Sequence, residues 1–358
     1  MKICDYQIKA LETDKIPWNE KNGPDILLLG FLGEMGALSK VFKRGERDGE
    51  VYESFKKHLN ENLGDLLWHV AILAHKFDVS FNYTPKHNKS HEDGMAVFYS
   101  LAHKVVRLSD ERKNLLRGDK QTSLEVKQLI YEILDDMDFI ASLYDTSLDV
   151  VAEENSKKIK SYWKGDLTLP ARQFDKDFPY YEKFPRKFEI EFVEIDNGKK
   201  VIMHMNGLNI GDRLTDNALK DDAYRYHDVF HLANLATLGW SPVFRSVLRC
   251  KRKSNRSVDE VQDGARAGII EEAVVNYIYD YARDLKFLNG KKLVDLNLIL
   301  RISKLVRNYE VESCEPWEWE HCILSGCNVF RSLKDNKGGR VRIDSDRRSI
   351  ELIGQPSS

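Results

Sequence analysis

The stretch LLGFLGEMGALSKVFKRG (residues 28–45) is an apolar run that contains one acid, Glu34, and ends in cations. Its apolar residues recur every three or four positions, which predicts a helix over 26–42 that ends at Gly45. An acid beside an apolar face is suited to hold a metal ion, and cations at the end of the same helix are suited to contact phosphates. The candidate phosphate ligands are Lys40, Lys43 and Arg44, followed by Arg47.

Helical spacing continues to about residue 165. The next stretch, GDLTLPARQFDKDFPYYEKFPRKF (165–188), contains three prolines and no periodicity, so we expect a linker over 166–186. The further helices that we expect before the linker lie over 51–77, 93–115, 123–145 and 148–163.

Strand patterns appear only after this stretch. FEIEFVEI (188–195) alternates apolar and charged residues and is followed, after a turn, by KVIMHM (200–205). Helical patterns return over 218–330, and GGRVRIDSDRRSIELI (338–353) predicts a closing hairpin. We therefore expect a mainly α protein. Its parts are a helical bundle over 1–165, and an α+β domain over 187–358 that is mostly helical with a small antiparallel sheet.

The composition limits the class of protein. A chain of 358 residues is long enough for two domains, and its net charge of −2 gives no overall field for nucleic acid or an anionic membrane. Five irregularly spaced cysteines favour reduced thiols, and the chain begins without a secretory signal. No run reaches the roughly 18 apolar residues of a membrane span. We expect a cytoplasmic protein that does not bind membranes, and the charge does not favour nucleic acid as a partner.

Acids on the second expected helix could join Glu34. Residues three or four apart share a face of a helix, so Glu61 and Asn62 each lie beside Asp65. Carboxylates from facing helices are the ligands that a hard cation such as Mg²⁺ prefers. The alternative is a solvated charged face with no metal.

The strings GFLGEMGALSK and ENLGDLLWHVAILAHKFDVSF resemble the MazG-type all-α nucleoside triphosphate pyrophosphohydrolases. VVAEENSKKIKSYW resembles the end of such domains, where an Asn and a Lys occur in the family pattern. The resemblance therefore covers about 24–165. It implies cleavage of nucleoside triphosphates to monophosphate and pyrophosphate with Mg²⁺ (or Mn²⁺), by a homodimer or higher homo-oligomer. Glu34 matches the first acid of the family pattern and Asp65 the last, which implies catalytic roles.

Two positions depart from the family pattern: Ala37 and Asn62 stand where acids belong. Asn62 can still offer a carbonyl oxygen to a metal, whereas Ala37 cannot bind one. Substitute acids could come from elsewhere in the bundle. The candidates are Glu61, Glu132, Asp135, Asp136 and Asp138.

A second group of candidate ligands lies in DDAYRYHDVFHLANLATLGW (221–240). His227 and His231 share a helix face at a spacing suited to one metal ion, with Asp228 about 100° round the helix. In VQDGARAGIIEEAVVNYIYDYA (261–282), Glu271 and Glu272 enter an otherwise apolar pattern, which is costly unless something pairs with them. The alternatives are a hydrogen-bonded histidine pair and a salt bridge from the acids to Arg266 or to nearby basic residues.

Those basic residues form the run FRSVLRCKRKSNR (244–256), which has six cations and no acid. Such a run is either a solvated loop or a phosphate site, whose ligands would be Lys251, Arg252 and Lys253. Metal ligands together with phosphate-binding cations are what phosphoester hydrolysis requires.

The His227-Asp228 doublet resembles the HD-type metal-dependent phosphohydrolases, which implies a divalent transition metal and catalytic roles for His227 and Asp228. The match departs from the pattern because the earlier histidine, His204, is expected on a strand and because the last ligand is a glutamate. The sequence thus predicts a metal-dependent nucleotide hydrolase that cleaves a (d)NTP to (d)NMP and pyrophosphate, with possible dephosphorylation by the second domain. The alternatives are a degenerate nucleotide-sensing module and a nucleic-acid contact through the basic run.

Overall fold

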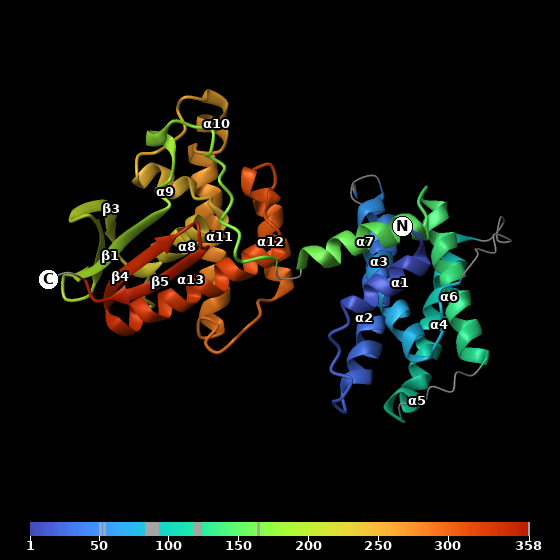
Figure 1. Ribbon diagram of the computed structural model, residues 1–358. Helices are drawn as coiled ribbons and strands as arrows, with labels where there is room; N and C mark the ends of the chain where they lie inside the picture. The colour runs from blue at the N-terminus through green and yellow to red at the C-terminus, as the bar shows by residue number, and fades with distance from the viewer. Residues whose placement is uncertain (50–51, 53–54, 83–92, 118–123, 163–164, 357–358) are drawn as a thin grey trace. The chain divides into compact units, whose positions relative to one another are not determined.

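The computed structural model describes residues 1–49, 52, 55–82, 93–117, 124–162 and 165–356, and the chain divides into two compact units, Met1–Lys160 and Ser161–Ser358 (Figure 1). The first unit is helical in its described part, and the second combines helices with a five-stranded antiparallel sheet. The predicted fold class is therefore confirmed. Within the described residues, no helix is both long and apolar enough to span a membrane.

The first unit is built around α3, whose leucine stripe (Leu59, Leu63, Leu66 and Leu67) is fully buried. Helix α2 packs along α3, and α4 packs along α6. The described helices of this unit are α1 (Ile3–Glu12), α2 (Gly23–Asp48), α3 (Phe55–Lys76), α4 (Gly94–Leu108), α5 (Arg112–Arg117), α6 (Leu124–Leu143) and α7 (Leu148–Tyr162).

Helix α2 runs through Gly45 to Asp48, so the helix end predicted at Gly45 is wrong. A glycine costs a helix about 1 kcal/mol relative to alanine, which is tolerated where another group must come close. Such a group is present here, because a Cβ on Gly45 would lie 2.6 Å from the ring of Phe55. The chain leaves the helix at Gly49, which has a φ of 52°. The helix ends expected at residues 51 and 163 lie outside the described residues.

The second unit has the strand order β3-β2-β1-β4-β5, and α8 and α13 pack on each other and against β4 and β5 (Figure 1). The expected strands are present, and His204 lies in β2 as predicted; β3 was not expected. The elements of this unit are β1 (Lys187–Ile195), β2 (Lys200–Met205), β3 (Leu208–Leu214), α8 (Asp228–Leu238), α9 (Pro242–Val247), α10 (Arg256–Val261), α11 (Ala265–Asp284), α12 (Leu296–Leu305), α13 (Pro316–Asn336), β4 (Gly338–Asp344) and β5 (Ser349–Gly354).

The stretch 166–186, expected to be a linker, is instead part of the second unit. The buried carboxylate of Asp175 accepts hydrogen bonds from the backbone N–H of Phe184 at 2.8 Å and from Arg245 at 3.1 Å, and it also pairs with Arg186. The N–H of Ala171 donates to the carbonyl of Ser345 at 2.8 Å. Ion pairs and backbone bonds therefore fix a stretch that has no apolar periodicity.

The basic run 244–256 is partly buried, which corrects the phosphate-binding role expected for Arg252. The Arg252 side chain is 1% exposed and lies 2.6 Å from Asp263 and 2.8 Å from Glu310. Arg245 is buried as well and pairs with Asp175 and Asp263. A buried guanidinium group needs carboxylate partners to offset its lost hydration, and these two arginines have them. Lys251 and Lys253 are more accessible, so only they remain candidates from the run.

We expect Arg252→Met to lower the free energy of unfolding of the second unit by about 3–5 kcal/mol, because it removes the nearest cation from the buried Asp263 and from the partly buried Glu310. Lys253→Met, at an exposed neighbour, is the control and should change it by less than about 0.5 kcal/mol. Urea unfolding measures both. Equal stability of the two variants would show that Arg252 is not the cation that neutralises these acids.

His69 gives the first unit a pH-dependent stability. Its imidazole packs against α2 so closely that a Cβ on Gly30 would lie 2.4 Å from the ring, and its Nδ1 is buried with no hydrogen-bond partner among the described residues. Burial lowers the pKa of His69 from 6.5 to about 4. The unfolded chain therefore binds a proton that the folded chain excludes between these two values, so stability falls as the pH drops through this window.

When the pH falls from 7.5 to 5, His69 should lower the free energy of unfolding of the first unit by about 2 kcal/mol. We expect His69→Gln to remove this part of the pH dependence, although the variant is less well packed. The measurement is the urea unfolding midpoint of both proteins at the two pH values. A variant as pH-sensitive as the natural protein would exclude His69 as the titrating group.

Candidate functional site

In the first unit, Glu34 of α2 and Asp65 of α3 lie near each other. Burial first, and then the charge of Asp65, raise the pKa of Glu34, while Lys158 opposes this shift. Asp65 accepts a hydrogen bond from the Asn155 amide at 2.9 Å and from the Lys158 ammonium at 2.5 Å. Asn155 and Lys158 come from the VVAEENSKKIKSYW string, so the structure brings the two predicted acids together with the Asn and Lys of that string.

The other predicted ligands of this unit bond locally. Glu61 pairs with Lys57 at 3.9 Å, the amide of Asn62 donates to the carbonyl of His58 at 2.6 Å, and Glu132 accepts from Gln128 at 2.9 Å. Asp135 lies on α6 with Glu132. Among the described residues of this unit, no three His, Cys, Asp or Glu side chains bring ligand atoms together. A cavity of about 380 Å³ lies between Lys57, Asn60 and Glu61 of α3 and Glu154, Asn155 and Lys158 of α7.

The cations of α2 lie away from Glu34. Lys43 is nine residues further along the helix, which places it about 14 Å along the axis and about half a turn round from Glu34. Arg44 pairs with Asp48 at 3.6 Å and lies 4.0 Å above the ring of Tyr52. Lys40 is exposed between these positions. The structure therefore does not bring these three cations to the predicted acids.

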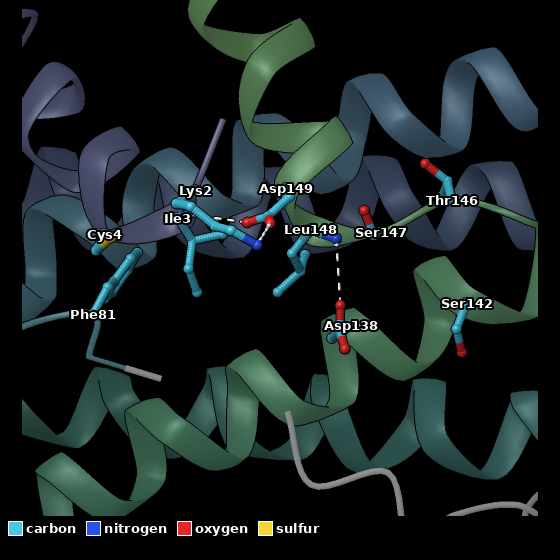
Figure 2. Close-up of a pocket in the computed structure, with 10 residues that line it drawn as sticks. All are labelled: Lys2, Ile3, Cys4, Phe81, Asp138, Ser142, Thr146, Ser147, Leu148 and Asp149. Atoms are coloured by element: carbon cyan, nitrogen blue, oxygen red, sulfur yellow. Dashed lines mark hydrogen bonds and ion pairs between the residues drawn. The ribbon is translucent and has the colours of Figure 1, made fainter. Parts of the chain in front are cut away.

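Figure 2 shows another cavity of the first unit, of about 400 Å³, where the starts of α1 and α7 meet. Its carboxylates hold the two helices in place. Asp149 accepts from Lys2 at 2.7 Å and from the N–H of Ile3 at 3.1 Å, and Asp138 accepts from the N–H of Leu148 at 3.3 Å. We assign the cavity a structural role.

In the second unit, His227, Asp228 and His231 place ligand atoms within 4.8 Å of one another, and all three side chains are buried. His227 precedes the first turn of α8, Asp228 begins the helix, and His231 follows one turn later. The structure thus brings together three of the residues that the sequence predicted as ligands.

Both imidazole rings have an oxygen atom close to Nδ1. His227 Nδ1 lies 2.9 Å from the carbonyl of Tyr224, and its ring stacks on the Tyr224 ring at 4.2 Å. A carbonyl can only accept, so Nδ1 of His227 carries the proton and its Nε2, 3.5 Å from Asp228, has a free lone pair. His231 lies 3.0 Å from Glu271 through Nδ1 and 3.4 Å from Glu272 through Nε2. Asp228 thus lies beside Nε2 of His227, and Glu272 lies beside Nε2 of His231.

The two glutamates of α11 differ in their surroundings. Glu271 is fully buried and accepts hydrogen bonds from Asn234 at 3.0 Å, from the Ser241 hydroxyl at 3.0 Å and from the Val243 N–H at 2.9 Å. Its oxygens are therefore already in use, which argues against its predicted role as a metal ligand. Glu272 is 48% exposed at its side chain and faces Nε2 of His231. Among the described residues, neither glutamate pairs with Arg266, the alternative that the sequence left open.

The side chains around His227 and His231 include more acids than cations. Asp228, Glu271 and Glu272 surround two histidines, and no Lys or Arg in the described part of the chain bonds to these acids. Burial, more than the charges of the other acids, raises the pKa of Asp228. Burial alone would lower the pKa of His231, but Glu271, followed by Glu272 and Asp228, raises it to about 10. Imidazole nitrogens with carboxylate oxygens form a donor set that fits a divalent transition metal, whose charge would balance the acids.

The family model described as "MazG C-terminal domain" matches residues 169–356, more than half of the chain. The chain belongs to this family. The MazG C-terminal domain thus contains residues 169–186 of the stretch expected to be a linker and the whole group from His227 to Glu272. The likeness of residues 24–165 to MazG-type enzymes and that of the second unit to HD-type phosphohydrolases stay predictions.

The chain is also similar to "Gene 37 protein" of Mycobacterium phage L5. The two are 29% identical over 94 residues, which cover 25% of this chain and 82% of the phage protein. No solved structure matches the chain.

The different surroundings of Glu271 and Glu272 predict different effects of their removal. Glu271→Ala should lower the free energy of unfolding by about 3 kcal/mol or more, because three buried donors lose their acceptor. Glu272→Ala should change it by less than about 1 kcal/mol, since that side chain is half exposed, but should weaken Mn²⁺ binding at least tenfold. Urea unfolding and Mn²⁺ titration followed by electron paramagnetic resonance measure the two effects. Unchanged Mn²⁺ affinity in Glu272→Ala would remove it from the ligand set.

Proposed function

We propose that this protein is a metal-dependent nucleotide hydrolase and that its best-assembled centre consists of His227, Asp228, His231 and Glu272. The observation that carries the proposal is the convergence of His227, Asp228 and His231, with Glu272 3.4 Å from Nε2 of His231, and no Lys or Arg among the described residues beside these acids. Membership of the MazG C-terminal domain family supports a nucleotide as the substrate. A divalent cation bound there would polarise a phosphoryl oxygen and acidify a bound water molecule.

The residues around this centre have distinct tasks. The Tyr224 carbonyl and Glu271 orient the two imidazole rings so that Nε2 of each can bind the cation. Asp228 adds a carboxylate oxygen from the first turn of α8. Glu272 is the most exposed acid of the group, and its contact with His231 lowers its pKa, so it is charged at neutral pH and would offer the cation a carboxylate oxygen.

The first unit supplies the second part of the proposal, the cleavage of a (d)NTP to (d)NMP and pyrophosphate. Glu34 and Asp65 would bind Mg²⁺ or Mn²⁺, and the adjoining cavity would admit the nucleotide. The second centre could then remove the phosphate of the monophosphate that the first releases.

One observation favours a different role for the first unit. Lys158 already forms an ion pair with Asp65. Ala37 and Asn62, which stand where the family pattern has acids, carry no charge that could bind a metal ion. A unit with these features can bind a nucleotide without cleaving it. The second candidate function is therefore a nucleotide-sensing module that regulates the C-terminal domain or a partner.

Chromatography of the products from each NTP and dNTP, with Mn²⁺ or Mg²⁺, tests these assignments. Glu34→Gln should lower pyrophosphate release by about 10²-fold or more and leave monophosphate hydrolysis intact, while His227→Ala should do the reverse. Glu189→Gln, on an exposed part of β1, is the matched control.

Each failure has its own meaning. If the natural protein stops at the monophosphate, the second centre is not a phosphatase for that product. If it binds triphosphates but leaves them intact, the sensing module is correct for the first unit. If it acts on no nucleotide under any of these conditions, the hydrolase proposal is wrong.

A further inference from the structure

A cavity of about 520 Å³ lies in the second unit, where α10 ends, α11 begins and α12 ends. Its charged lining consists of three cations, Arg266, Lys304 and Arg307, and one acid, Glu260. The acid is already paired, because the guanidinium of Arg256 lies 2.9 Å from it. The lining therefore carries a net positive charge.

The three cations have no acidic partner within the described part of the chain. They come from two separate helices and the turn after α12, and like charges that converge on one cavity repel each other. Lys304 is favourably placed at the carbonyl end of α12, but Arg266 stands in the first turn of α11, where a cation is unfavourable and no acid is present. An anion in the cavity would reduce the repulsion among the three cations and would offset the unfavourable position of Arg266 at the start of α11.

The rest of the lining is apolar. Val261 and Leu305 are 51% and 39% exposed, and Ile270 and Tyr309 line the cavity beside them. Apolar side chains do not add to the affinity for an inorganic anion, whereas they can bury the apolar surface of a base or sugar that is attached to a phosphate. The volume lies within the range of small-molecule sites, roughly 300–1,000 Å³.

The wall that carries Arg307 and Tyr309 is held in place. The N–H of Glu310 donates to Gln262 at 2.9 Å, and the carboxylate of Glu310 bonds to Arg252 at 2.8 Å. These bonds fasten the turn after α12 to the end of α10. A ligand would therefore enter a largely preformed cavity.

This cavity is separate from the metal-binding group, although α11 contributes to both. Arg266 and Ile270 share one face of α11, and at about 100° per residue Glu272 lies roughly 200° round from Ile270. We propose that the cavity is a second nucleotide site, which binds a nucleoside phosphate without a metal ion. The proposal does not depend on hydrolysis at either of the centres described above.

Calorimetric titration of the full chain with ATP in the presence of EDTA tests the proposal, because chelation removes metal-dependent binding. The test variant is Lys304→Glu with Arg307→Glu. The control is Lys291→Glu with Lys292→Glu, which changes the net charge equally at exposed positions outside the cavity. We expect the test variant to lose one bound ATP per chain, or to bind it at least tenfold more weakly, while the control matches the natural protein.

Titrations with pyrophosphate and single-stranded DNA, and with a Leu305→Ser variant, define the ligand. ATP should bind more tightly than pyrophosphate, and Leu305→Ser should weaken ATP binding but not pyrophosphate binding. Equal affinities for ATP and pyrophosphate would overturn the nucleoside part of the proposal. Equal loss in test and control variants, or binding of single-stranded DNA in place of ATP, would overturn the site itself. Retained hydrolysis with Mn²⁺ in the test variant would show that the metal centre is independent of these outcomes.

Discussion

The buried carboxylate of Glu271 joins three helices of the MazG C-terminal domain. It projects from α11, contacts His231 and Asn234 of α8, and accepts from Ser241 and from the Val243 N–H, at the start of α9. A carboxylate without hydrogen bonds at such a depth would cost several kcal/mol, so α8, α9 and α11 are stable only in an arrangement that supplies these partners. That arrangement also fixes the ring of His231, because the same carboxylate contacts its Nδ1. The position of His231 in the group that it forms with His227 and Asp228 therefore follows from a structural requirement of the fold.

Local patterns predicted most of the secondary structure, and tertiary contacts explain where they failed. The alternation in FEIEFVEI and KVIMHM gave two neighbouring strands, but β3 is exposed at most of its positions and so has no alternation to detect. Gly45 was misread as a helix end because its close neighbour, Phe55, lies on another helix. The basic run was misread for a similar reason. The acids that neutralise Arg245 and Arg252 include Asp175 and Glu310, which are 70 and 58 residues away in the chain, so sequence showed the charge but not its burial.

At the candidate site, too, the local sequence pattern predicted one part of the arrangement, and tertiary contacts determine the rest. The spacing of His227 and His231 correctly predicted that they meet, since one helical turn separates them. The roles of Glu271 and Glu272 were left open because neighbours on a helix differ by only about 100°, and the rotation of α11 decides which of them is buried. Tyr224 was missed altogether. It acts through its backbone carbonyl and its ring, and neither leaves a signal in the spacing of charged residues.

The two units differ in how ready their acids are to bind a cation. Around His227 and His231, a backbone carbonyl and two carboxylates lie beside the ring nitrogens, and His231, whose pKa is raised to about 10, would have to release a proton to bind a metal through Nε2. Around Asp65, the Lys158 ammonium already supplies a positive charge, and a metal ion must displace it or share the carboxylate. The nearby Glu34 is less readily ionised because burial and Asp65 raise its pKa. A triphosphate could draw Lys158 away from Asp65, since its charge is greater than that of one carboxylate. Metal binding in the first unit would then follow nucleotide binding, whereas in the MazG C-terminal domain it would precede it.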